Sequence, residues 1–73
     1  MSERVLANRL KDIRSEKGLT QADLAAKVGV SRKTINTVEN LVFVPSTTLA
    51  LALAETFGMN VEDIFYLEPE RRR

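Results

Sequence analysis

Residues 19–40 read LTQADLAAKVGVSRKTINTVEN and hold two predicted helices joined by a short turn. Thr20 is a typical N-cap, and Asp23 three residues later completes a capping box. Gly29 supplies the positive φ that a sharp turn requires. Ser31 begins the second helix, whose apolar side chains recur at the spacing of an inward-facing stripe. The stretch therefore predicts two short helices packed at a tight corner.

Three further helices are expected around this corner. The first covers about residues 3–17, because Val5, Leu6, Leu10 and Ile13 fall on one stripe. Another follows Pro45-Ser46 and stops at Gly58, and a short one begins at Asn60, with Asp63 completing a capping box. No segment predicts a strand. The expected fold class is all-α, a compact five-helix bundle formed by residues 1–67, with residues 68–73 as a short charged tail.

Composition excludes several classes of protein. The chain has 73 residues, enough for one small domain, and contains neither Cys nor His. It therefore lacks the commonest general base and the commonest metal ligands, so we expect no enzyme, no metal and no cofactor. No apolar run approaches the ~18 residues of a membrane span, and the N-terminus does not resemble a signal peptide. These features predict a cytoplasmic binding module with no membrane partner.

Charge is unevenly distributed along the chain. Residues 1–40 carry eight basic and five acidic side chains, whereas residues 41–70 carry five acidic side chains and no Lys or Arg. One face of the helix that starts at Ser31 presents only polar groups without an acid. A basic half with such a face suits a polyanion, although an ordinary solvated helix face has the same composition.

These residues resemble the phage-repressor-like helix-turn-helix family, also called Cro/CI or XRE. The resemblance runs through residues 19–40, Pro45-Ser46, Phe57-Gly58 and residues 61–65, and so covers nearly the whole chain. It implies a lambda-repressor-like DNA-binding fold in which the helix at about residues 31–40 enters the major groove. The implied partner is double-stranded DNA.

The resemblance also implies individual roles. It places Arg32, Lys33, Asn36 and Thr37 at base-reading positions, where Arg and Lys suit guanine O6/N7 and Asn suits adenine N6/N7. Candidate phosphate contacts are Gln21, Ser31, Thr34 and Asn40, although capping alone explains Ser31 and a first-turn position alone explains Gln21. Arg14 and Glu39 match a family ion pair expected to be structural.

The chain departs from the family pattern at residues 41–44, which read LVFV. Family members commonly have Gly and then a polar or basic loop here. Either Val42 and Phe43 fold back onto the core, or Leu41, Phe43 and Val44 form a subunit interface with part of the following helices. The helix after Ser46 is apolar nearly all round, which predicts burial on every side.

The sequence thus predicts a sequence-specific DNA-binding transcriptional regulator, acting as a repressor. A homodimer would bind a near-palindromic operator with half-sites about 34 Å apart. The alternative is a protein-interaction module, such as a DNA-binding antitoxin, whose apolar loop 41–44 docks a protein partner.

Overall fold

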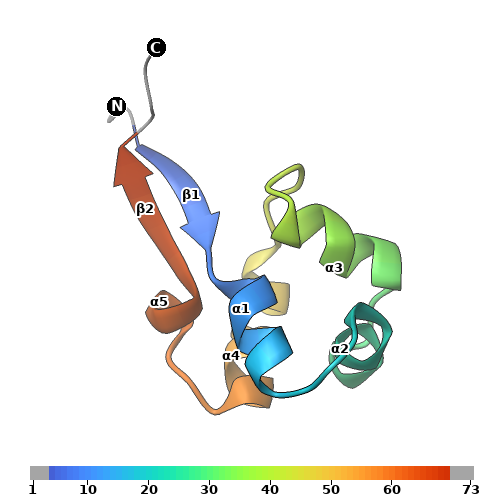
Figure 1. Ribbon diagram of the computed structural model, residues 1–73. Helices are drawn as coiled ribbons and strands as arrows, with labels where there is room; N and C mark the ends of the chain where they lie inside the picture. Colours follow the sequence, from blue (N-terminus) through green and yellow to red (C-terminus); the bar gives the residue numbers. More distant parts are fainter. Residues whose placement is uncertain (1–3, 70–73) are drawn as a thin grey trace.

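The computed structural model describes residues 4–69, which form five helices and a two-stranded antiparallel ribbon (Figure 1). In chain order the elements are β1 (Arg4–Asn8), α1 (Leu10–Glu16), α2 (Gln21–Val28), α3 (Arg32–Glu39), α4 (Thr47–Phe57), α5 (Val61–Ile64) and β2 (Phe65–Pro69). The helices form one body, from which the ribbon extends at one side (Figure 1).

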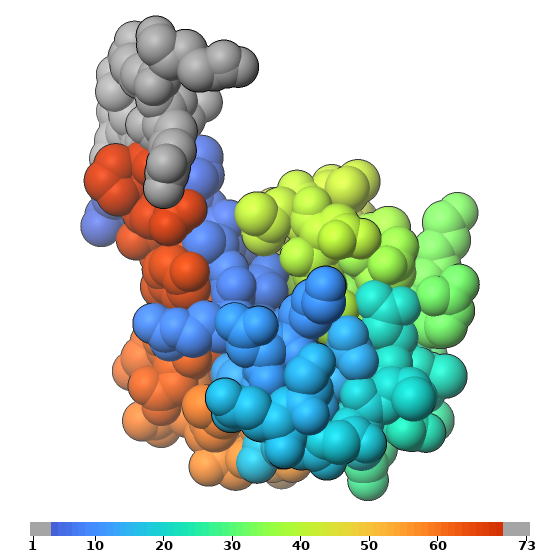
Figure 2. Space-filling view, in the orientation of Figure 1, coloured from blue at the N-terminus to red at the C-terminus, as the bar shows by residue number. Residues whose placement is uncertain are grey.

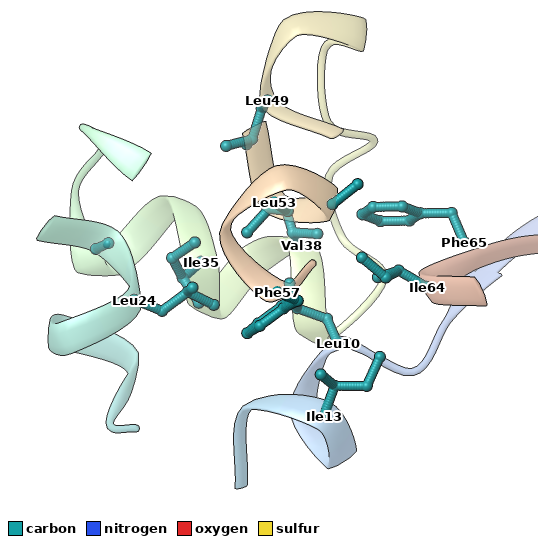
Figure 3. Close-up of a cluster of buried hydrophobic side chains, with 12 residues drawn as sticks. Leu10, Ile13, Leu24, Ile35, Val38, Leu49, Leu53, Phe57, Ile64 and Phe65 are labelled. Carbon is teal, nitrogen blue, oxygen red and sulfur yellow. The ribbon is translucent and has the colours of Figure 1, made fainter. Parts of the chain in front are cut away.

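One apolar cluster holds the helices together. Side chains from all five helices and from β2 converge on it (Figure 3). The fully buried members are Leu10, Leu24, Ile35, Val38, Leu53 and Ile64. Each such side chain contributes about 1.5–3 kcal/mol by leaving water. The cluster therefore fixes α3 from its inner face and leaves the opposite face available.

The corner between α2 and α3 forms as predicted. Thr20 Oγ1 accepts from the Asp23 amide at 2.9 Å, and Asp23 Oδ2 accepts from the Thr20 amide at 3.0 Å. Gly29 ends α2 with φ +77°, and the Ser31 side chain caps α3 by accepting from the Thr34 amide. These local signals determine where α2 ends and α3 begins.

The five predicted helices are present among the described residues, but the first begins at Leu10 and not near residue 3, and the fold is not purely all-α. Arg4–Asn8 is a strand that pairs with Phe65–Pro69, with Leu6 opposite Leu67. Asn8 Oδ1 accepts from the Leu10 amide at 3.0 Å and so marks the true start of α1. Pairing satisfies those backbone groups of each strand that face the other strand, which neither segment could do alone.

Two further expectations about the C-terminal part need correction. Glu68 and Pro69, placed at the start of a charged tail, belong to β2, whereas residues 70–73 lie outside the described part of the chain. Asn60 occupies the N-cap position of α5, but its side chain makes no capping hydrogen bond, so the expected box with Asp63 does not form.

The segment after α3 ends the helix with an unusual residue. Leu41 has φ +63°, and within residues 4–69 it is the one non-glycine residue in the left-handed region. Its amide donates to the Val38 carbonyl and the Val42 amide donates to the Thr37 carbonyl. This is the Schellman arrangement that normally uses Gly. The leucine therefore adopts the conformation of the missing glycine at an energetic cost.

Residues 41–44 lie on the surface. Val42 is 76% exposed and Phe43 is 55% exposed, so the expectation that they fold back onto the core is wrong. Helix α4 is also not covered on every side, because Leu51 is 55% exposed on the face opposite Leu53. In Figure 1 the loop between α3 and α4 projects beyond the end of α3, toward the same end of the molecule as the ribbon.

Candidate nucleic-acid interface

The outer face of α3 presents polar and basic side chains. Arg32 and Lys33 are exposed in the first turn, which carries no acid, and Asn36 and Thr37 are half-buried one turn later. The space-filling view shows α3, in green, at the edge of the molecule next to α2 (Figure 2). All four predicted base-reading residues thus lie on one element with its inner side fixed by Ile35 and Val38.

Arg14 and Glu39 form an ion pair between α1 and the end of α3. Arg14 Nε donates to Glu39 Oε2 at 2.6 Å and Nη2 donates to Oε1 at 3.2 Å. Their side chains are only 12% and 2% exposed. The hydrogen bond that Arg14 donates to the Glu39 carboxylate raises the pKa of Arg14 above its ordinary value. Arg14 Nη1 also donates to the Leu19 carbonyl, so the guanidinium ties three segments together.

Gln21, at the start of α2, links this ion pair to the outer face of α3. Its Nε2 donates to Glu39 Oε1 at 3.0 Å and to Asn36 Oδ1 at 3.2 Å. Its Oε1 accepts from Arg32 Nη1 at 3.1 Å. Both amide hydrogens of Gln21 are therefore in use. The Gln21 side chain could donate to a phosphate only after one of these bonds breaks.

The other predicted phosphate contacts lie around the two ends of α3. Ser31 Oγ accepts from the Thr34 amide and lies 3.0 Å from Thr34 Oγ1, so both hydroxyls already take part in the N-terminal cap. Asn40, exposed at the C-terminal end, donates through Nδ2 to Asn36 Oδ1 at 3.2 Å. Thr37 Oγ1 donates to the Thr34 carbonyl, which leaves the hydroxyl free only as an acceptor.

Asn8 supports this site and was missed in the sequence. Its Nδ2 donates to the Val38 carbonyl at 3.1 Å, which anchors the end of α3 to the start of α1. The available signal was an Asn in the middle of a predicted helix, because Asn favours caps over helix interiors. The hydrogen-bond network through Gln21 had no local signal, since its members lie on different helices.

The chain belongs to the helix-turn-helix family, whose sequence model matches residues 10–64. Two uncharacterized HTH-type transcriptional regulators, from Bacillus subtilis and Methanocaldococcus jannaschii, are 40% and 46% identical over 65 residues, which is 89% of this chain and 98% of each relative. The restriction-modification controller protein C.AhdI from Aeromonas hydrophila superposes with a TM-score of 0.71 at 31% identity, over 75% of this chain and 83% of that one. The protein is therefore an XRE-type helix-turn-helix regulator.

Residues 4–69 contain neither a candidate membrane span nor a candidate metal-binding cluster. No helix there has the length and apolarity to cross a membrane. No group of three or more Asp and Glu side chains gathers there in a way that could hold a metal ion.

Proposed function

We propose that this regulator is a repressor that reads DNA sequence with the outer face of α3, without catalytic activity or a cofactor. The observation that carries the proposal is the polar face of α3, which is exposed yet held in place by the Arg14–Glu39 ion pair and the Gln21 network. Preorganised side chains lose little freedom on binding, which favours a specific complex over a purely electrostatic one.

In this proposal Arg32, Lys33, Asn36 and Thr37 contact base edges in the major groove. Ser31, Thr34 and Asn40 contact phosphates from either end of α3, and Gln21 does so from the N-terminal end of α2, where unpaired backbone amides favour anions. Residues 41–69 carry no Lys or Arg, so that part of the chain is the side turned away from DNA.

We further propose a homodimer that uses the exposed segment 41–44. Leu41 and Val44 are 61% and 67% exposed, and Leu41 also holds a conformation that costs a leucine about 1–2 kcal/mol. An exposed side chain retained at such a cost is explained by a role outside the monomer. Because this segment directly follows α3, a dimer formed here leaves the first turn of α3 uncovered. Such a dimer suits a near-palindromic operator that excludes polymerase when occupied.

The first experiment is selection of bound sequences from a random duplex pool with the purified protein at two salt concentrations. Enrichment of a two-fold-symmetric motif supports a dimeric, sequence-reading regulator. A complete lack of enrichment at low salt would refute the proposal.

Arg32→Ala should cost about 1–3 kcal/mol of DNA-binding free energy and relax selectivity at one base pair. Gln21→Ala should weaken binding to all sequences about equally if the residue serves phosphate alone.

Exposure of the segment 41–44 also favours a second candidate, a DNA-binding antitoxin that docks a protein partner. Phe43→Asp and Val44→Asp separate the two proposals. In the homodimer they produce monomers by analytical ultracentrifugation, with Lys27→Asp on the exposed side of α2 as a charge control. In the antitoxin they leave the oligomeric state unchanged and instead abolish a stable hetero-complex on co-purification from the native host.

A further inference from the structure

The carbonyl oxygen of the Asn36 side chain has no acceptor capacity left. Asn36 Oδ1 accepts from Gln21 Nε2 and from Asn40 Nδ2, each at 3.2 Å, and an amide oxygen has two lone pairs. Among residues 4–69, no hydrogen bond is made by Asn36 Nδ2. No buried side-chain nitrogen or oxygen in that range lacks a partner, so Nδ2 reaches solvent. The outer side of Asn36 is therefore a donor.

This orientation is imposed by charged groups at both ends of the network. Gln21 lies between Glu39, whose carboxylate only accepts, and Arg32, whose guanidinium only donates. Turning the Gln21 amide over would place oxygen against the Glu39 carboxylate and nitrogen against the Arg32 guanidinium. Gln21 therefore directs Nε2 toward Asn36, and Asn36 must present Oδ1 as the acceptor. The Arg14–Glu39 ion pair fixes the inner end of this chain of bonds.

We infer that Asn36 reads DNA only through its Nδ2 donors and selects a base edge that offers acceptors alone. This inference rests on the proposed DNA-reading function of α3. In the major groove, guanine presents N7 and O6 and thymine presents O4, without a donor on the same base. Adenine adds the N6 donor, whose usual partner is the amide oxygen of Asn. That oxygen is occupied here, so the adenine pairing expected from the residue type alone is disfavoured.

In this inference Gln21 is a positioning residue for Asn36. It sets which atom of Asn36 faces the DNA without having to touch the base itself. The consequence differs from that of a phosphate contact, because loss of Gln21 alters the base preferred at one position as well as the overall affinity.

The test repeats the duplex selection with Asn36→Ala beside the wild-type protein. The operator position whose preference disappears in the variant is the one read by Asn36, and selectivity there should fall roughly 3- to 10-fold, as for one hydrogen bond. Every base pair holds one guanine or thymine and one adenine or cytosine, so base analogues that lack the major-groove acceptors are then placed at that position on one strand at a time to identify the base that Asn36 contacts. In the wild type that base should be the guanine or thymine. Loss of affinity only when the adenine or cytosine is altered overturns the inference, as does an Asn36→Ala variant that keeps every preference.

The second arm uses Gln21→Met, which keeps the length of the side chain and removes its amide. In this variant only the exposed Asn40 amide still donates to Asn36 Oδ1, so one lone pair of that oxygen becomes available. Asn36 can then accept from adenine N6, and adenine should become acceptable at the same position. An unchanged base preference with uniformly weaker binding would show that Gln21 does not position Asn36, and it would overturn the proposed chain of bonds.

A third arm needs no DNA. In the free protein, proton exchange measured by NMR should be slower for Gln21 Nε2 than for Asn36 Nδ2, because only the former is engaged at both hydrogens. The reverse order overturns the inference directly. If the wild-type protein enriches no motif while the NMR result holds, the proposed function fails and the side-chain network stands.

Discussion

Replacing Leu41 by Gly should stabilise the fold. Leu41 lies at φ +63° and its side chain is 61% exposed, so little packing is lost with it. The left-handed conformation costs a residue with a Cβ about 1–2 kcal/mol. Glycine also makes the unfolded chain more flexible, which lowers the stability of the fold by about 0.4–1 kcal/mol and offsets part of this gain. The difference predicts a net gain of about 1 kcal/mol in the free energy of unfolding.

Leu41→Ala is the matched control, because it removes the same exposed side chain and keeps the Cβ. Gly58→Ala is the reverse experiment. Gly58 ends α4 at φ +65°, and a Cβ placed there would have no atom within 4 Å, so only the conformation is penalised. We expect Gly58→Ala to lose about as much stability as Leu41→Gly gains over Leu41→Ala.

The assay is urea unfolding followed by circular dichroism at several protein concentrations, which separates folding from association. With the slope of about 1–3 kcal/mol per M that small proteins show in urea, a gain of 1 kcal/mol raises the urea midpoint by about 0.3–1 M. If Leu41→Gly is no more stable than Leu41→Ala, the conformational cost at residue 41 does not exist. The conformation of Leu41 would then give no support to an interface at residues 41–44.

Three other perturbations test the supports of α3 and α2. Glu39→Ala should cost about 3 kcal/mol in urea unfolding, because Arg14 is left in a largely buried position without its partner. Asn8→Ala should cost about 1–2 kcal/mol in the same assay, through loss of its hydrogen bonds to Leu10 and Val38. Hydrogen bonds from Thr20 lower the pKa of Asp23 below its ordinary 3.8, so this carboxylate stabilises the fold above that pH, and the contribution is lost as the pH falls through the folded-state pKa. The urea midpoint of Asp23→Asn should therefore fall less than that of the wild type between pH 5 and 2, and parallel pH profiles would contradict the assignment.

The helices of the fold could be predicted because their signals are local. Thr20 with Asp23, Gly29 and Ser31 determine the corner between α2 and α3 within a dozen residues of sequence. The ribbon could not be found in the same way, because β1 and β2 are separated by the whole helical body. Val5 and Leu6 fit a helical stripe as well as a strand, and only the distant partner decides between them.

The sequence predicts which residue types lie on the outer face of α3, but it does not predict how their side chains are hydrogen-bonded. The sequence places Asn36 on the outer face of α3, and residue type alone suggests that it pairs with adenine. The structure adds Gln21 and Asn40 on the Asn36 oxygen, which changes the chemistry that the residue can offer. These hydrogen bonds depend on where side chains from separate helices meet, and the spacing of residues along the chain does not predict them.

The pairing of β1 with β2 also constrains the order of folding during synthesis. Leu6 emerges from the ribosome long before Leu67, its partner across the ribbon, so β1 must wait unpaired while the helices are made. The helices between residues 10 and 64 can assemble first, and closure of the ribbon comes last. A chain interrupted before residue 65 would keep an unpaired strand edge, which is a site for aggregation and for capture by quality control. Ribbon closure thus distinguishes chains that extend through residue 69 from chains interrupted before residue 65.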